Sequence, residues 1–161
     1  MPEPITTTGP AIGQIAPDFT LPRDGGGSVT LSGFRPGAVV LYFYPKDDTP
    51  GCTLEAIDFT ARAADFANLG ATVIGISKDS VKAHDKFVKK HSLGIALVSD
   101  EAGTTCEDYA TWVEKSMYGK TYMGIERATY LIDGNGIVAR VWRKVSVKGH
   151  VDEVLAAVAA L

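Results

Sequence analysis

The chain has few cysteines and little excess charge, and these shortages exclude several classes of protein. Two cysteines among 161 residues are too few for a disulfide framework, and they match no spacing of metal ligands. A formal net charge of −3 argues against a nucleic-acid partner, because phosphate backbones are bound by basic surfaces. No apolar run approaches the roughly 18 residues that a membrane-spanning helix needs. We therefore expect no nucleic-acid or membrane partner, no metal and no other cofactor.

The first residues contain neither the basic nor the apolar stretch of a secretory signal. Residues 1–14 are instead rich in proline, glycine and threonine, which favours a loose N-terminal arm. The absence of a signal and the shortage of cysteine both favour the reducing cytoplasm. What the chain does have is 45% apolar residues, enough to bury one core, so we expect a single domain over residues 1–161.

Apolar runs alternate with amphipathic stretches along the chain, which predicts an α/β fold. Residues 16–22 and 29–31 flank three glycines and predict a small N-terminal hairpin. The strand at 38–44 is apolar throughout rather than alternating, so it belongs at the centre of a sheet buried on both faces. We therefore expect a mixed central sheet flanked by helices. The other expected strands are 72–77, 95–98, 128–132 and 137–142, and the expected helices are 53–68, 80–91, 104–112 and 151–161.

The central strand leads into a polar loop that ends on Cys52, followed by residues that can start a helix. The first N–H groups of a helix have no intrahelical partner and carry partial positive charge, so they stabilise a thiolate. The loop adds a hydroxyl from Thr49, three residues before the sulfur. Pro45 and Pro50 restrict the loop, and Gly51 lets the backbone approach a ligand closely. This pattern predicts a reactive cysteine rather than a buried structural one.

The spacing Pro45-x-x-x-Thr49-x-x-Cys52 resembles that of peroxiredoxins, and the longer string YFYPKDDTPGCT resembles their bacterioferritin comigratory protein or PrxQ branch. A second block at 117–133, MYGKTYMGIERATYLID, is similar to another stretch of that branch and includes Arg127. The resemblance extends from about residue 13 to the C-terminus. It implies a thioredoxin-like fold in which the N-terminal hairpin is an extension.

The resemblance also implies roles for individual residues. Cys52 would be the peroxidatic cysteine, whose thiolate becomes a sulfenic acid, and Arg127 would hold that thiolate. Thr49 would orient the peroxide, Glu55 would brace the arginine, and Pro45 would shield the sulfur from water. The activity implied is thiol-dependent reduction of hydrogen peroxide and organic hydroperoxides, an antioxidant role in cell redox homeostasis. Thioredoxin or another thiol would be the reductant, and the protein would be a monomer or weak dimer.

The chain departs from that pattern in its second cysteine. Many relatives carry a resolving cysteine five residues after the first, where this chain has Ile57, and residues 80–91 contain none. Cys106, in the short helix expected at 104–112, is the remaining candidate. We expect it to be inert and half-buried, which favours a one-cysteine cycle, and the alternative is an atypical two-cysteine cycle in which Cys106 resolves.

A different class of function is a non-catalytic thioredoxin-like binding or chaperone module with a redox-sensing Cys52. Such a module does not need Thr49, Cys52 and Arg127 together, so the trio favours the peroxidase.

The remaining polar residues are weaker candidates. The three histidines have no cysteine or carboxylate partner at metal spacing, so helix-face or solvent positions are expected. Asp47 and Asp48 are expected to face water. A basic cluster on and after the last strand indicates a solvated or protected sheet edge rather than a binding patch. Trp112, at the end of the short helix, is expected to pack or to line the rim of the active site. The basic cluster consists of Arg140, Arg143, Lys144 and Lys148.

Overall fold

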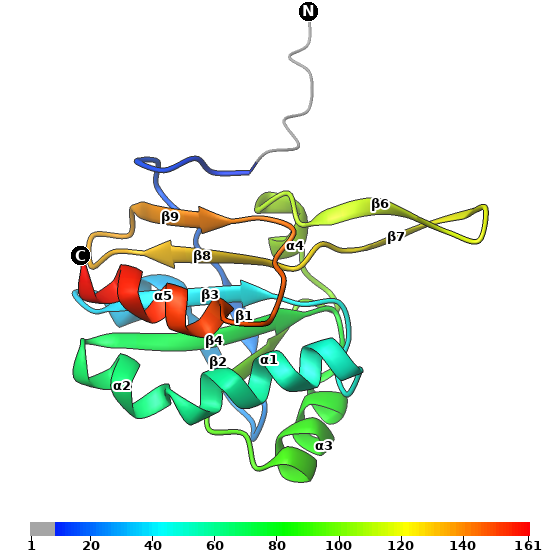
Figure 1. Cartoon of the computed structure of the whole chain (residues 1–161), viewed down its shortest axis with the longest axis horizontal. Coiled ribbons are helices and arrows are strands. Elements are labelled where there is room, and N and C mark those ends of the chain that lie inside the picture. Colours follow the sequence, from blue (N-terminus) through cyan, green and yellow to red (C-terminus); the bar gives the residue numbers. More distant parts are fainter. Residues whose placement is uncertain (1–8) are drawn as a thin grey trace, which may run out of the picture.

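A five-stranded mixed sheet forms the centre of the computed structural model, which describes residues 9–161 (Figure 1). Its strand order is β5-β4-β3-β8-β9, with β3 parallel to β4 and antiparallel to β8. The mixed sheet and the central place of β3 are therefore confirmed, and the predicted strand ends are correct to within one residue. The strands are β3 (Ala38–Phe43), β4 (Ala71–Ser77), β5 (Ala96–Ser99), β8 (Ala128–Ile132) and β9 (Val138–Trp142).

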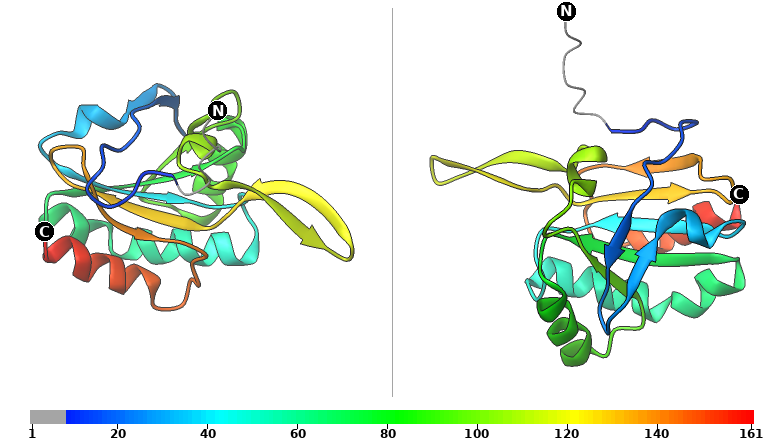
Figure 2. Two further views of the ribbon diagram at one scale, coloured as in Figure 1. Left: turned by 90° about the horizontal axis from the view of Figure 1, so that it is seen from above. Right: turned by 180° about the vertical axis from the view of Figure 1, so that it is seen from behind.

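Two apolar clusters lie on opposite faces of this sheet. Helices α1 (Pro50–Ala61), α2 (Ala63–Asn68) and α5 (His150–Ala159) cover one face (Figure 2). The hairpin of β1 (Thr20–Pro22) and β2 (Ser28–Thr30), the 3-10 helix η1 (Leu31–Phe34) and α4 (Thr105–Asp108) cover the other. Side chains of β3 alternate between the two clusters, and every residue of the strand is buried, as its uninterrupted apolar sequence predicts.

The predicted N-terminal hairpin is confirmed, with Thr20 opposite Thr30 in an antiparallel pair. Most of the predicted loose arm, residues 1–8, lies outside the described residues. The arm is already attached at its end, because the Gly13 N–H donates to the Val138 carbonyl at 2.8 Å. None of the helices in residues 9–161 combines the length and apolar composition needed to cross a bilayer.

Helix α3 (Val81–His91) confirms the helix expected at 80–91. Ser80 is its N-cap, because the Ser80 side chain accepts a hydrogen bond from the Ala83 N–H at 3.1 Å. The helix predicted at 53–68 instead begins earlier, at Pro50, and is interrupted at Arg62. A proline in the first turn costs no hydrogen bond, so the earlier start is favourable.

The prediction of a helix at 104–112 is wrong beyond its first turn. Ala110 adopts φ +56°, which ends α4, and Trp112 begins a strand. Strands β6 (Trp112–Met117) and β7 (Lys120–Ile125) form an antiparallel hairpin that projects from the body of the protein (Figure 1). Its two turn residues, Tyr118 and Gly119, both have positive φ, the geometry that matches a two-residue hairpin.

Candidate active site

Cys52 lies in the first turn of α1, at the end of the loop that follows β3. Thr49 is the N-cap, with extended backbone angles, and Pro50 is the first helical residue. The N–H groups of Gly51 and Cys52 therefore lie at the positive end of the helix, before the first intrahelical hydrogen bonds. The Cys52 residue is only 2% exposed, so the sulfur faces a protected site rather than bulk water.

The Cys52 sulfur is contacted by Arg127, which comes from a distant part of the sequence. Arg127 precedes β8, whose residue Ala128 pairs with Phe43 at the end of β3, so the backbone register places Arg127 beside the loop that leads to Cys52. Its Nη2 lies 3.4 Å from the Cys52 Sγ, and its Nη1 donates to Glu55 Oε1 at 2.7 Å. The guanidinium thus connects the sulfur to a carboxylate, as the resemblance implies.

Gly51 makes room for this contact. A Cβ at position 51 would lie 3.1 Å from Arg127 Nη2, closer than a comfortable packing distance. A side chain here would push the guanidinium away from the sulfur. Glycine is therefore required for a close approach and not for a special backbone angle.

Glu55 follows Cys52 by three residues, so both side chains lie on one face of α1. It is fully buried, and its Oε2 has no hydrogen-bond partner among the described residues. Burial raises the pKa of Glu55 to about 7, against the opposing effect of Arg127. Burial also works against the charge of Arg127, but Glu55 and Cys52 raise its pKa above the ordinary value. Arg127 therefore stays cationic, and Glu55 changes its charge near neutral pH.

This geometry predicts a pH-dependent difference in stability between wild type and Glu55→Gln. Folded wild type holds the Glu55 proton more tightly than the unfolded chain, so its stability should fall as pH rises from 4.5 towards about 7. Glutamine keeps an oxygen for Arg127 without this cost, so the variant should gain on the order of 2–3 kcal/mol relative to wild type across that range. Urea unfolding at either end measures the difference, and parallel pH curves for the two proteins would contradict the prediction.

The loop before Cys52 contains Thr49, whose side chain is hydrogen-bonded, and Pro45, which is exposed. The Thr49 hydroxyl donates to the Lys46 carbonyl at 2.8 Å, so its proton is in use and its lone pairs remain to accept a hydrogen bond. Pro45 is exposed at the start of the loop, where it lines a groove of about 400 Å³. The groove runs between this loop and the β6–β7 hairpin, and its other lining residues include Lys46, Trp112, Tyr122, Met123 and Ile125.

The groove borders the loop that leads to Cys52, through Pro45 and Lys46, and Lys115 in its wall interacts electrostatically with Arg127 and Cys52. Burial lowers the pKa of Lys115, the charge of Arg127 lowers it further, and Cys52 acts in the opposite direction. Trp112 packs against one of the apolar clusters, as one of the two alternatives predicted, and it also lines the groove. It does so from β6 rather than from a helix.

Cys106 is far less accessible than the sequence suggests. It is fully buried in α4, not half-buried, and burial followed by the nearby Asp100 raises its pKa well above the usual range. It belongs to the apolar cluster on one face of the central sheet, whereas Cys52 belongs to the cluster on the other face. Both cysteines are free thiols, and the structure does not bring them together.

The expectation that the loop carboxylates face water is wrong for Asp47 but holds for Asp48. His84 and His91 lie on helix α3, as expected for helix-face positions. Asp47 does not face water, since its side chain is 7% exposed and its Oδ2 lies 2.6 Å from Nδ1 of the buried His84. Asp48 is exposed, but it pairs with Lys90 at 2.7 Å and with His91 at 2.9 Å. Each partner is about forty positions away in sequence, so local spacing gives no signal for these contacts.

The basic cluster lies at a sheet edge, as predicted, because β9 is the outer strand of the central sheet. Arg143 is not simply solvated. Its Nε donates to Glu126 Oε2 at 2.6 Å, and its Nη2 donates to the Ala110 carbonyl at 2.6 Å. It therefore ties the end of β9 to the segments that flank the β6–β7 hairpin.

Comparison with known proteins places this arrangement in a family. Residues 12–141 match the AhpC/TSA family. Peroxiredoxin Bcp of Bacillus subtilis is 50% identical over 144 residues, which are 89% of this chain and 92% of that protein. A Xanthomonas campestris bacterioferritin comigratory protein, whose structures concern its alkyl peroxide reduction activity, superposes with a TM-score of 0.84 at 46% identity, over 88% of this chain and 90% of that one. Peroxidoxin BcpB of Mycobacterium tuberculosis superposes with a TM-score of 0.83 at 35% identity, over 94% and 98%.

Proposed function

Since this chain belongs to the AhpC/TSA family as a thiol-dependent peroxiredoxin, we propose that Cys52 is the residue that attacks the peroxide. The observation that carries the proposal is the contact of its Sγ with Arg127 Nη2 at 3.4 Å, at the N-terminus of a helix. A guanidinium and the free N–H groups of a helix are the groups that stabilise a thiolate. Membership of this family also leaves no support for the alternative of a non-catalytic module.

In the proposed reaction the electron pair of the Cys52 thiolate forms a bond to the terminal oxygen of ROOH. The O–O bond breaks, the leaving oxygen takes up a proton as ROH, and Cys52 becomes a sulfenic acid. Negative charge moves from sulfur to the leaving oxygen during this step. Arg127 and the N–H groups of Gly51 and Cys52 lie where they can stabilise both ends of that movement.

Thr49 would fix the direction of attack. Because its hydroxyl proton is donated to Lys46, the oxygen is left as an acceptor for the O–H of the peroxide. Glu55 would hold Arg127 in place through the 2.7 Å contact with Nη1. Pro45, at the start of the loop, would limit the access of water to the sulfur, the role that the family resemblance implies for it.

The substrates proposed are hydrogen peroxide and organic hydroperoxides. The groove beside the loop supports the second class, because Trp112, Tyr122 and Met123 give it apolar surface that an alkyl or aryl group can cover. The Xanthomonas relative, studied for alkyl peroxide reduction, supports the same class.

The reductant proposed is thioredoxin or another thiol, acting directly on the sulfenic acid in a one-cysteine cycle. Direct attack needs the first turn of α1 to open, since Cys52 is almost buried. That turn is exposed at Pro50, and the loop before it is exposed at Pro45. Cys52 and Cys106 belong to apolar clusters on opposite faces of the central sheet. A disulfide between them would therefore require one face of the core to unfold locally. We further propose that the chain acts in the cytoplasm as a single domain and as a monomer or weak dimer.

The test of this cycle is the steady-state activity of Cys106→Ser. With a small dithiol as reductant, the variant should keep most of the wild-type rate of peroxide consumption, because Cys106 takes no part. Peroxide without thiol should add oxygen to Cys52, giving sulfenic and then sulfinic acid. A quantitative intramolecular disulfide in wild type, with protection from overoxidation, would instead make Cys106 the resolving residue.

A further inference from the structure

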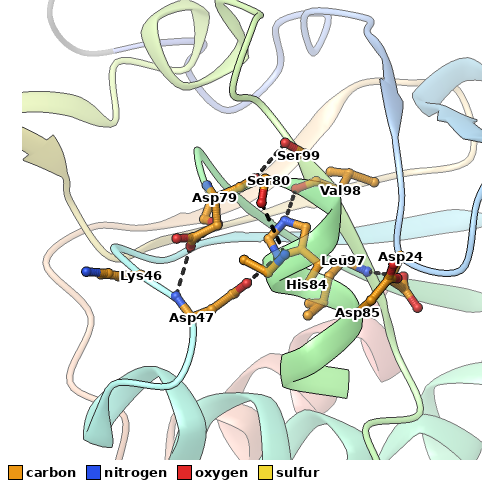
Figure 3. A network of polar contacts seen from close by, with 12 residues as sticks. Asp24, Lys46, Asp47, Asp79, Ser80, His84, Asp85, Leu97, Val98 and Ser99 are labelled. Atoms are coloured by element: carbon orange, nitrogen blue, oxygen red, sulfur yellow. Dashed lines mark hydrogen bonds and ion pairs between the residues drawn. The ribbon is translucent and has the colours of Figure 1, made fainter. Parts of the chain in front are cut away.

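A buried histidine, His84, contacts Asp47 in the loop that leads to Thr49 and Cys52 (Figure 3). His84, on α3, is fully buried, and its Nδ1 lies 2.6 Å from Oδ2 of Asp47 in the loop. Its Nε2 lies 2.9 Å from the carbonyl of Val98 on β5. The Tyr44 hydroxyl donates to the other Asp47 oxygen at 2.5 Å. No polar atom of the histidine ring is left for solvent.

These distances settle where the protons are. A backbone carbonyl only accepts, so Nε2 of His84 must carry a proton. Nδ1 faces a carboxylate oxygen at 2.6 Å, and two lone pairs at that distance would repel, so a second proton lies between them. The two groups therefore share one proton, and because an imidazole is more basic than a carboxylate, the pair is an imidazolium and a carboxylate, buried together.

A proton fits this gap better than a metal ion does. Asp47, Asp79 and His84 offer ligand atoms within 4.8 Å of one another. Two atoms bound to one ion at about 2.1 Å in tetrahedral geometry would, however, lie roughly 3.4 Å apart, and the Asp47–His84 contact is 2.6 Å. The Asp79 Oδ2 is already engaged, since it accepts from the Asp47 N–H at 2.8 Å and from the Ser77 hydroxyl at 2.7 Å.

Asp47 is therefore fixed through both its backbone and its side chain. The turn that follows is short, because Asp48 has φ +59° and the Thr49 hydroxyl bonds back to Lys46. Helix α1 begins at the next residue, Pro50. Because Thr49 is only two residues further along the chain, a displacement of Asp47 would also displace Thr49 and the first turn of α1, which contains Cys52. The exposed contacts of Asp48 with Lys90 and His91 add a second attachment of this turn to α3.

We propose that His84 is a positioning residue of the peroxidase, whose charged pair with Asp47 fixes the loop that presents Thr49 and Cys52 to the peroxide. The proposal rests on the function proposed above for Cys52. His84 touches neither the sulfur nor the substrate and acts through Asp47.

The pair also gives the reaction a dependence on pH with a definite sign. The groups that face His84 are Asp47 from the loop, Asp79 after β4 and Tyr44 from the end of β3. Burial lowers the pKa of His84, but Asp47, then the Val98 carbonyl and then Asp79 raise it above the ordinary value. Burial holds the pKa of Tyr44 far above its usual range, so Tyr44 stays neutral. Loss of either ring proton leaves a lone pair against an acceptor, either Asp47 or the Val98 carbonyl. The contact between His84 and Asp47 (the clamp) is therefore complete at low pH and is weakened as pH rises through the raised pKa of His84.

The experiment measures the second-order rate of Cys52 with hydrogen peroxide by stopped flow, from about pH 6 to about pH 10. Wild type should lose rate on the alkaline side, by about threefold or more, instead of reaching a plateau. Asp47→Asn should lack this decrease, because an asparagine N–H can donate to a neutral Nδ1 and hold the loop at every pH. His84→Gln should be slower by about tenfold, since glutamine keeps a donor for Val98 but no charged partner for Asp47.

Lys89→Gln is the matched control, because it removes one positive charge from an exposed position of the same helix. It should keep the wild-type rate and profile. A wild-type plateau at alkaline pH shared by Asp47→Asn, a wild-type rate in His84→Gln, or an equal effect of Lys89→Gln would each overturn the proposal. If His84→Gln fails to fold, wild type and Asp47→Asn still decide. A failure of the proposed role of Cys52 looks different, since wild type would then show no fast reaction of Cys52 at any pH.

Discussion

Cys52→Ser is expected to reduce peroxide turnover by roughly a thousandfold or more while the fold remains intact. A serine hydroxyl at this position is not ionised at neutral pH and is a far weaker nucleophile than a thiolate. The change replaces one buried sulfur by oxygen, and the hydroxyl still accepts from Arg127, so the packing of α1 is preserved. Steady-state consumption of hydrogen peroxide with a dithiol measures the loss.

Cys106→Ser is the matched control for this change. It removes the other thiol of the chain from the opposite face of the sheet and should leave turnover largely unchanged. Thermal unfolding of both variants checks that the loss follows chemistry rather than folding. A Cys52→Ser protein that retains a large share of the activity would remove the basis for every role assigned to its neighbours.

Arg127→Lys is expected to slow the reaction with peroxide by about a hundredfold, although the positive charge is retained. The guanidinium donates to two groups at once, with Nη2 on the sulfur at 3.4 Å and Nη1 on Glu55 at 2.7 Å. A lysine ammonium is a compact charge without this planar fork, so it cannot hold both contacts in the same geometry. Stopped-flow rates at several peroxide concentrations separate this effect from that of the reductant.

Arg140→Lys provides a control with the same chemical change. Arg140 is exposed on β9, where its guanidinium lies over the Trp142 ring, 4.9 Å from the centroid, and away from the sulfur. It should react at the wild-type rate. If Arg127→Lys also stays within about twofold of wild type, the charge alone is sufficient and the fork has no catalytic role.

The central sheet could be predicted because its signals are local. An unbroken apolar run predicts β3, and the amphipathic stretch at 80–91 predicts α3. The β6–β7 hairpin was missed because its turn, Tyr118-Gly119, lacks the usual asparagine or aspartate, although glycine supplies the positive φ at the second position. The helix over 104–112 failed for a related reason. Ala110 adopts a left-handed conformation that alanine rarely takes, and the N–H of Thr111 bonds to the Cys106 carbonyl at 2.8 Å to close the helix.

In the candidate site, too, the features with local sequence signals could be predicted and the long-range contacts could not. A motif of eight positions contains Thr49 and Cys52, and a second motif contains Arg127, so the resemblance identifies all three from the sequence alone. The clamp of Asp47 by His84 could not be predicted, because it joins a loop to a helix 37 positions away through the packing of α3 against β5. The positions of Cys52 and Cys106 on opposite faces of the sheet likewise could not be predicted, because they depend on how the helices pack.

The central claim is that Cys52 takes the oxygen from the peroxide, and the mass of the protein after one turnover tests it most directly. Fully reduced protein receives one equivalent of hydrogen peroxide in the presence of a reagent that traps sulfenic acid, and the peptides are then mapped. We predict a single adduct on Cys52, with Cys106 recovered as a free thiol. An adduct on Cys106 with Cys52 unmodified would contradict the claim.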